Sequence, residues 1–191
     1  MALAELEIGR VEGPQEAARL SALDATEILD TEPEPSFDAI TRLCAEYFRA
    51  DTVLLGFADA SRVWIKSYWG EAVRELPRAG SVFEMVLAED GPVVVPDISR
   101  DPHFEGGHKR IRRLDVVSFA SAPVRSSRGL ILRALTVFGC QPRRAMSVDE
   151  LRMLESLADM AACQLELRML RKGVRGQASR RSRAAKSAPK R

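Results

Sequence analysis

The sequence predicts an α+β fold in which helices cover a central antiparallel sheet of about five or six strands. Two pairs of apolar segments, 52–57 with 63–69 and 116–124 with 130–140, are each separated by a short polar turn, as in β-hairpins. Segments with helical apolar spacing precede and follow these hairpins. Helices at the two ends of the chain are therefore expected to cover one face of the sheet.

The chain is predicted to become helical after a flexible N-terminus, residues 1–13, which show no regular pattern. A helix is expected from Pro14, because proline suits the first helical turn. The prolines within residues 30–35 end it, and Ser36 is expected to cap a second helix. The apolar residues of both helices are expected to face the core: Ala17, Leu20, Leu23, Ile28 and Leu29 in the first, and Phe37, Ile40, Leu43, Cys44, Tyr47 and Phe48 in the second.

The first hairpin carries large aromatic side chains on its return strand. Because side chains alternate across a strand, Trp64, Lys66 and Tyr68 are expected on one face and the intervening residues on the other. Trp64 and Tyr68 are therefore candidates to line a pocket on the same face of the sheet, although large aromatic residues on strands are often core residues.

A short helix, a strand and a long loop are expected between the two hairpins. Polar residues before Ser81 predict a loop, and Ser81 with Glu84 predicts a capping box for the short helix. Val93–Val95 reads as a short strand that ends at Pro96, which has no N–H to donate. The helix and the loop 96–113 are expected to cover the second face of the sheet and to enclose a pocket there.

The last helix is predicted from Val148 to about Arg171, with Ser147 and Glu150 as a capping box. Beyond it, residues 172–191 have no apolar period and are expected to be disordered. The predicted domain therefore covers residues 14–171. The apolar residues of the helix step by three and four, as in a heptad seam: Leu151, Leu154, Ala158, Ala161 and Leu165.

Charge is unevenly distributed. Residues 172–191 hold eight basic and no acidic residues, which leaves 21 basic against 27 acidic residues in the rest of the chain. Such a tail can contact nucleic acid or an anionic membrane, but it lacks aromatic residues for base stacking. A solubilising tail is the alternative.

Composition narrows the possible classes of protein. No apolar run approaches the roughly 20 residues that span a bilayer, and the N-terminus lacks the apolar segment of a signal peptide, so a cytoplasmic location is expected. Three widely spaced cysteines predict neither a disulfide framework nor a zinc site. His103 and His108 lie near Asp97 and Asp101, but their irregular spacing does not match a metal site, and no metal is predicted.

Four blocks of residues follow one another in order within residues 16–170. They are Ile28-Leu29-Asp30-Thr31 with Pro33-Glu34 and Phe37-Asp38, then Asp59, Arg62, Trp64, Lys66 and Ser67, then Arg74, Glu75, Pro77 and Arg78, and finally Asp97, Asp101, Pro102 and Phe104. In this order they resemble the GAF domain, a small-molecule sensor module of bacterial signalling proteins. The resemblance implies a GAF-like fold and a sensory role, because the matching subgroup often precedes histidine kinase or diguanylate cyclase domains.

The chain departs from the family's best-known chemistries. Ser81-Val82-Phe83 stands where the subgroup commonly has Ser-Phe-Cys, and no cysteine matches the one that links bilin in phytochromes. The Asn-Lys-Phe-Asp-Glu signature of cyclic-nucleotide phosphodiesterase GAF domains is also absent. The cofactor is therefore left unknown.

The candidate ligand site is the pocket between the sheet and the loop 96–113. The basic residues of this loop favour an anion, because arginine pairs bidentately with phosphate or carboxylate. A solvated basic face is the alternative. No catalytic residue is predicted, and the predicted ligand-binding residues are Trp64, Tyr68, Ser81, Met85, Phe104, His108, Arg110, Arg112 and Ser118.

The expected function is regulatory and non-enzymatic. The domain is expected to bind a small molecule, to pair as a homodimer through its terminal helices, and to pass a signal to a partner protein. One alternative is a thiol-dependent reductase of the free methionine sulfoxide type, which needs two cysteines within disulfide reach at the pocket. The other is a ligand-free interaction module, whose pocket would be filled by Phe83, Met85, Phe104 and Phe119.

Overall fold

The computed structural model describes residues 13–71, 74–79, 81–104, 109–111 and 114–187, with the backbone path alone for residues 109–111, 114 and 175–187. It confirms the α+β class. Six strands form one antiparallel sheet in the order β3–β2–β1–β8–β7–β4. Their bounds are β1 Thr52–Ala58, β2 Arg62–Trp69, β3 Glu75–Pro77, β4 Val93–Val95, β7 Ser118–Arg125 and β8 Ile131–Gly139.

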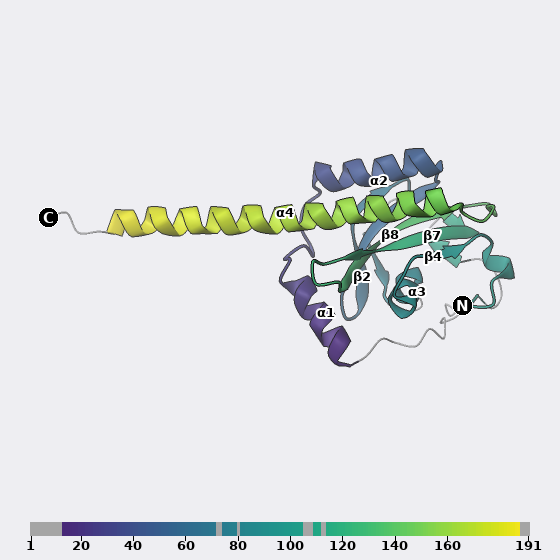
Figure 1. Ribbon diagram of the computed structural model, residues 1–191, viewed down its shortest axis with the longest axis horizontal. Coiled ribbons are helices and arrows are strands. Elements are labelled where there is room, and N and C mark those ends of the chain that lie inside the picture. Colours follow the sequence, from purple (N-terminus) through teal and green to yellow (C-terminus); the bar gives the residue numbers. More distant parts are fainter. Residues whose placement is uncertain (1–12, 72–73, 80, 105–108, 112–113, 188–191) are drawn as a thin grey trace.

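Helices cover both faces of this sheet (Figure 1). Helices α2 and α4 run along one face, whereas α3 packs on the other. A single 3-10 turn and a separate two-stranded ribbon complete the described part of the chain. The bounds are α1 Pro14–Asp24, α2 Pro35–Phe48, α3 Val82–Glu89, η1 Ile98–Arg100, β5 Lys109–Ile111, β6 Leu114–Val116 and α4 Val148–Ser187.

Each face of the sheet has its own apolar core. The α2/α4 core joins α1, α2 and α4 to the sheet and includes Leu23, Phe37, Phe57, Leu135 and Leu154. The α3 core lies on the opposite face, where its buried members are Leu54, Ala58, Val63, Ile65, Val82, Phe83, Met85, Val86, Val93, Val95, Ile98, Phe104, Val116, Phe119, Ala134 and Phe138. The expected placement of the terminal helices on one face is thus confirmed.

A β-bulge in the first hairpin overturns the predicted alternation of its side chains. Leu55 pairs with Ser67, but the next residue, Gly56, pairs with Ile65, so Lys66 is an extra residue in β2. An added Cβ at Gly56, opposite the bulge on β1, would lie 2.7 Å from Cγ1 of Val63, so a larger residue would force its neighbours to move.

The bulge places Trp64 and Tyr68 on opposite faces. Trp64 pairs with Phe57 and is buried in the α2/α4 core, whereas Tyr68 pairs with Leu54 of the α3 core and is half-exposed. The prediction that the two aromatic residues share one pocket is therefore wrong. Strict alternation fails wherever a strand gains an extra residue.

The N-terminal helices differ from the prediction at their ends. The helix α1 ends at Asp24 instead of continuing to Leu29, and Glu27 and Asp30 adopt positive φ in the turns that follow. The N-cap of α2 is Glu34 and not Ser36, because Pro35 takes the first helical position. The carboxylate of Glu34 is thereby left to bind cations, as described below.

The capping box predicted at Ser147 is confirmed, whereas the one at Ser81 is not formed. The backbone N–H of Ser147 donates to Glu150 Oε2 at 2.8 Å, and the N–H of Glu150 donates to Ser147 Oγ at 3.2 Å. Ser81 does precede α3, but its hydroxyl makes no capping bond and is buried without a partner among the described residues. Its expected partner, Glu84, instead accepts a hydrogen bond from Arg78.

Two segments that were predicted as loops contain short strands. These are β3, before α3, and β5, within the loop 96–113, which pairs with β6 directly after that loop. The last helix is also longer than predicted, because α4 ends at Ser187 and not near Arg171. Residues expected to be disordered therefore continue the helix. Alanine, arginine, lysine and glutamine are strong helix formers, so this segment can be helical without an apolar period. At 1.5 Å per residue, a 40-residue helix is about 60 Å long, and Figure 1 shows it projecting far beyond the sheet.

A buried arginine lies in the α2/α4 core. Arg133 of β8 is 3% exposed, and its Nη2 donates to the Ala161 carbonyl oxygen of α4 at 2.6 Å. Its Nε and Nη1 have no partner among the described residues. The guanidinium lies 4.7 Å from the ring centroid of Phe57, and burial lowers its pKa to about 9. A largely unsatisfied cation therefore occupies this core.

The Arg133→Met variant is expected to be more stable than the natural chain. Methionine has a similar length, keeps a favourable contact with aromatic rings and needs no hydrogen-bond partners. Replacing a poorly satisfied buried charge by an apolar side chain is expected to raise the free energy of unfolding by about 1–4 kcal/mol. Urea unfolding followed by circular dichroism measures this change, and a fall in stability would show that the guanidinium has a favourable partner.

Candidate functional site

The face on which the sequence predicts a ligand pocket is filled by apolar side chains. Phe83, Met85, Phe104 and Phe119 all belong to the α3 core, and the rings of Phe104 and Phe119 meet edge to face at 5.8 Å between centroids. This packing is what the ligand-free alternative expects of the described residues. Met85 and Phe104 thus act as core residues on this face.

The basic run of the predicted site falls largely outside the described structure. His108 and Arg112 lie outside the described residues, and Arg110 lies in β5, of which the backbone alone is described. Anion binding by this run therefore stays a prediction. His103 is exposed, and its Nδ1 lies 2.9 Å from Oδ1 of Asp101.

A cavity of about 390 Å³ lies on the other face of the sheet, at the corner where α2 ends and α4 begins. Val94, Ala120 and Val137 form a cross-strand row on β4, β7 and β8 and line it. Tyr47 and Phe48 of the last turn of α2 also line it, with their rings in edge contact at 4.8 Å. Helix α2 ends and helix α4 begins beside this corner, so neither helix covers it.

Ser118, a predicted ligand-binding residue, lines this cavity instead of the predicted one. Its hydroxyl donates to the Gln141 carbonyl oxygen at 2.8 Å. Gly139 is required next to it, because an added Cβ would lie 2.7 Å from Ser118 Oγ and 3.3 Å from Nε of Arg143. Small side chains on β7 therefore do leave space beside the sheet, but under the helix ends.

Three arginines border the cavity. Arg144 forms a two-pronged ion pair with Glu150, at 2.7 and 2.8 Å, which holds the pKa of Glu150 down at about 2. Nη2 of Arg143 donates to the Arg49 carbonyl oxygen at 2.9 Å, and the other two nitrogens of this side chain have no partner among the described residues. The Arg49 side chain is exposed, and no ion pair or hydrogen bond joins it to another described side chain.

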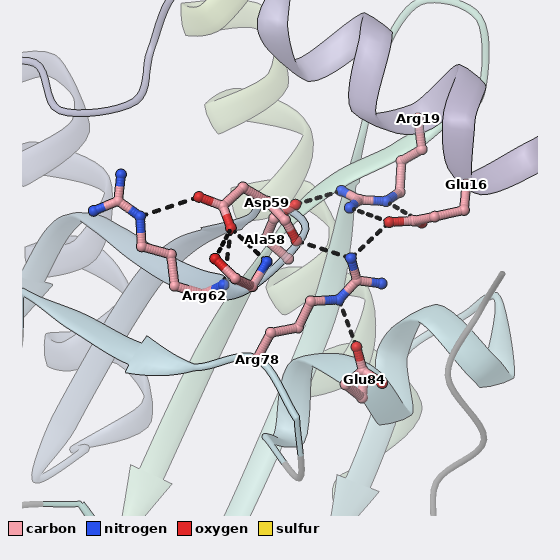
Figure 2. Close-up of polar contacts among 8 residues, drawn as sticks. Glu16, Arg19, Ala58, Asp59, Arg62, Arg78 and Glu84 are labelled. Carbon is pink, nitrogen blue, oxygen red and sulfur yellow. Dashed lines mark hydrogen bonds and ion pairs between the residues drawn. The ribbon is translucent and has the colours of Figure 1, made fainter.

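The second polar feature is a buried ionic network at the opposite end of the sheet (Figure 2). Arg78, 3% exposed, donates from Nε to Glu84 at 2.5 Å and from Nη1 to Glu16 at 2.6 Å and to the Asp59 carbonyl oxygen at 2.8 Å. Glu16 also accepts two hydrogen bonds from Arg19, at 2.7 and 2.8 Å. One guanidinium thus connects α1, the β1–β2 turn and α3.

The network keeps Glu16 ionised. Burial acts to raise the pKa of Glu16, but hydrogen bonds from Arg19 and Arg78 outweigh it and hold that pKa below its usual range. Arg19 also donates to the Ala58 carbonyl oxygen at 2.7 Å. Nη2 of Arg78 is buried without a partner among the described residues. The described hydrogen bonds of the four charged side chains join them to one another or to backbone carbonyls, so we interpret the network as a structural feature and not as a ligand site. Sequence reasoning missed it because its members lie far apart in the chain.

A third feature is the exposed face of α4. The residues predicted as its seam face inward instead: Leu154, Ala158, Ala161 and Leu165 are buried in the α2/α4 core, and Leu151 is half-buried. A second row of exposed residues, also stepping by three and four, runs along the outside of the helix. We call it the outer seam, and it consists of Met153, Ser156, Met160, Cys163, Leu167, Leu170 and Val174.

The helix α4 is fixed to the body where the outer seam leaves it. Arg168 donates to Oε1 of Glu34 at 2.8 Å and to the Thr26 carbonyl oxygen at 2.9 Å. Lys66 donates to the same Glu34 oxygen at 2.8 Å, so this carboxylate joins β2 to α4. Lys172 adds an ion pair with Glu27 at 2.9 Å.

Comparison with known proteins decides the family. The GAF domain family profile matches residues 32–165. The chain belongs to the GAF domain family. This GAF domain is 26% identical over 155 residues to a cyclic di-GMP phosphodiesterase of Pseudomonas aeruginosa, a match that covers 78% of the chain. The chain spans 26% of the length of that relative.

Solved structures show the same fold. The GAF domain of an Acinetobacter phosphoenolpyruvate-protein phosphotransferase matches with a TM-score of 0.58 and 18% identity, over 81% of this chain and 95% of that one. A free methionine-R-sulfoxide reductase from Neisseria meningitidis matches with a TM-score of 0.58 and 17% identity, over 85% and 96%. The second GAF domain of DevS from Mycobacterium smegmatis gives 0.55 and 17%, over 75% and 99%.

The three thiols of this GAF domain are free, and they lie in α2, in the segment after β8 and in α4. Cys44 is buried in α2, and burial raises its pKa to about 12. Burial and then the charge of Asp51 raise the pKa of Cys140, which follows β8. Cys163 belongs to the outer seam of α4. Neither Cys44 nor Cys140 is therefore activated as a thiolate nucleophile.

Two other properties concern the described residues alone. No group of three histidine, cysteine, aspartate or glutamate side chains in this part of the chain is placed to hold a metal ion. None of its helices combines the length and the apolar character that crossing a membrane requires.

Proposed function

We propose that this GAF domain is a regulatory module that works as a parallel homodimer, in which two copies pair along the outer seam of α4. The observation that carries the proposal is the spacing of the exposed apolar residues. Met153, Met160, Leu167 and Val174 lie seven residues apart, and Ser156, Cys163 and Leu170 alternate with them. This is the pattern of the contact positions of a two-stranded coiled coil.

A second copy of the chain is the partner that fits this surface best. The outer seam repeats with one period over three heptads, so an identical helix in the same register matches every position. Glu166 and Arg171 flank the outer seam. In a parallel pair, Glu166 of one chain would face Arg171 of the other, and their opposite charges would attract. Both residues are exposed and free to pair across chains.

The domain body is built to influence this helix. Glu34 ties Lys66 of the sheet to Arg168 of α4, and Lys172 is paired with Glu27 of the α1–α2 connection. A rearrangement of the body would therefore alter how α4 is held at the point where it leaves the domain. We propose that the pair passes such changes to a signalling partner, whether a separate protein or a further part of a longer chain.

Binding of a small ligand is the sensory part of this proposal. It is supported by the family and by the cavity beside the start of α4. Catalysis is not part of the proposal, because Cys44 and Cys140 have raised pKa values and the three thiols are free.

Cysteine cross-linking tests the parallel register. In a chain with Cys140→Ser and Cys163→Ser, the Leu170→Cys variant places a thiol on the outer seam, where it faces its own copy. Mild oxidation is expected to convert this variant to a covalent dimer on a non-reducing gel. The matched control is Met169→Cys, one residue away and off the seam. Equal cross-linking of both variants, or none at position 170, would refute a parallel pair.

A further inference from the structure

The cavity between the ends of α2 and α4 has the size and the polarity of a ligand site that is separate from the α3 face. Its volume of about 390 Å³ lies within the range of roughly 300–1,000 Å³ found for small-molecule pockets. Its floor is the row Val94, Ala120 and Val137, in which the alanine leaves a depression between two valines. These three floor residues have no hydrogen-bonding side chain, so the floor suits the apolar part of a ligand.

The rim of the cavity is cationic. Of its three arginines, Arg144 is neutralised by Glu150, so it is not available to a ligand. Arg143 is fixed by its own backbone, whose N–H donates to the Pro96 carbonyl oxygen at 2.9 Å, and by its Nη2 bond to the Arg49 carbonyl oxygen. Its remaining nitrogens have no partner in the described part of the chain.

The guanidinium of Arg143 is therefore held in place while some of its N–H hydrogen-bond donors remain available to a ligand. The missing side chain of Gly139 keeps space open for it, because a Cβ there would lie 3.3 Å from Nε of Arg143. Arg49 adds a second cation at the rim, and no described carboxylate is paired with it. Donors that are fixed before binding lose little entropy when they meet an anion, and guanidinium groups suit carboxylate and phosphate geometry.

We infer that this cavity binds a small amphipathic organic anion, with its apolar body over Val94 and Ala120 and its charged group on Arg143 and Arg49. The inference also rests on the proposed function in one respect. Met146, just before α4, and Glu150, in the first turn of α4, line the same cavity, so an occupant would contact the helix that joins the two copies.

The test uses 8-anilino-1-naphthalenesulfonate, an aromatic sulfonate whose fluorescence rises in apolar surroundings, titrated into the full chain. Saturable binding of one probe per chain is expected. Arg143→Gln is expected to weaken the affinity about tenfold, because it removes a charged hydrogen bond. Ala120→Leu is expected to abolish binding by filling the depression. The matched control Arg128→Gln removes an exposed arginine of the β7–β8 turn and is expected to change nothing.

A neutral analogue separates the two parts of the site. N-phenyl-1-naphthylamine has the same apolar body without the sulfonate. It is expected to bind at least about tenfold more weakly and to be insensitive to Arg143→Gln. Equal affinity of the sulfonate for the natural chain and for Arg143→Gln and Arg49→Gln would overturn the anion site, provided that circular dichroism shows all the chains folded. Unchanged binding to Ala120→Leu would place the probe elsewhere and would also overturn it.

Failure of this site and failure of the homodimer are distinguishable. The cavity lies within one chain, so the sulfonate is expected to bind a Met160→Lys/Leu167→Lys chain with an affinity within a few-fold of that for the natural chain, the difference being the linkage between probe binding and pairing. The link to α4 is tested by the dimer dissociation constant, which is expected to change at least about threefold at saturating probe. A constant that does not change would refute the link while leaving the binding site in place.

Discussion

The Arg78→Met variant is expected to lose about 3–5 kcal/mol of its free energy of unfolding, because it leaves the carboxylates of Glu16 and Glu84 buried without their shared cation. Both carboxylates are nearly inaccessible to water, so the solvent cannot replace the guanidinium. Chemical unfolding in urea at neutral pH measures the loss. A change below about 1 kcal/mol would contradict the role given to this network.

A pH series gives this prediction an internal control. The pKa of Glu16 is lower in the folded chain than the ordinary value of 4.5, so its ionised form contributes stability above that pH. The contribution is lost as the pH falls through the folded pKa. The stability gap between the natural chain and Arg78→Met is therefore expected to narrow below about pH 4.5. Arg62→Met is the matched control, because that arginine is about one-third exposed and two of its three carboxylate partners, Asp30 and Glu75, are exposed.

The second large effect is expected on association. The Met160→Lys/Leu167→Lys variant introduces four ammonium groups into the proposed dimer interface, and each must be desolvated without a partner. The dissociation constant is expected to rise at least about 100-fold, which corresponds to about 2.7 kcal/mol. Light scattering over a range of concentrations measures this constant.

The control for the lysine variant keeps the same chemistry off the outer seam. Val148→Lys/Met169→Lys replaces two exposed apolar residues of the same helix with lysine. It is expected to associate like the natural chain. If both double variants dissociate alike, the added charge and not the outer seam would explain the effect.

The fold could be predicted from the sequence where local patterns determine it. Both main hairpins and the cap at Ser147 follow from apolar runs, turns and a motif of four residues. The bulge at Lys66 left no such signal, because the sequence shows alternating side chains and not which residue is extra. This one extra residue, which the sequence pattern does not reveal, places Tyr68 on the opposite face from Trp64.

The candidate sites could be predicted from the sequence only in part. Two apolar rows step by three and four along α4, and tertiary packing decides which one is buried: the row that includes Leu154 meets the sheet, and the outer seam does not. The cavity depends on where two helices end, which the sequence places within a few residues at best. Ser118 was a useful signal because a small side chain leaves space on whichever face it lies.

The most direct test of the account is the mass of the natural chain in solution. Sedimentation velocity at micromolar concentration is expected to show a species of twice the 21.1 kDa chain mass, which dissociates on dilution. A single species of 21.1 kDa at every concentration up to the highest that can be measured would contradict the proposal that two copies pair along α4.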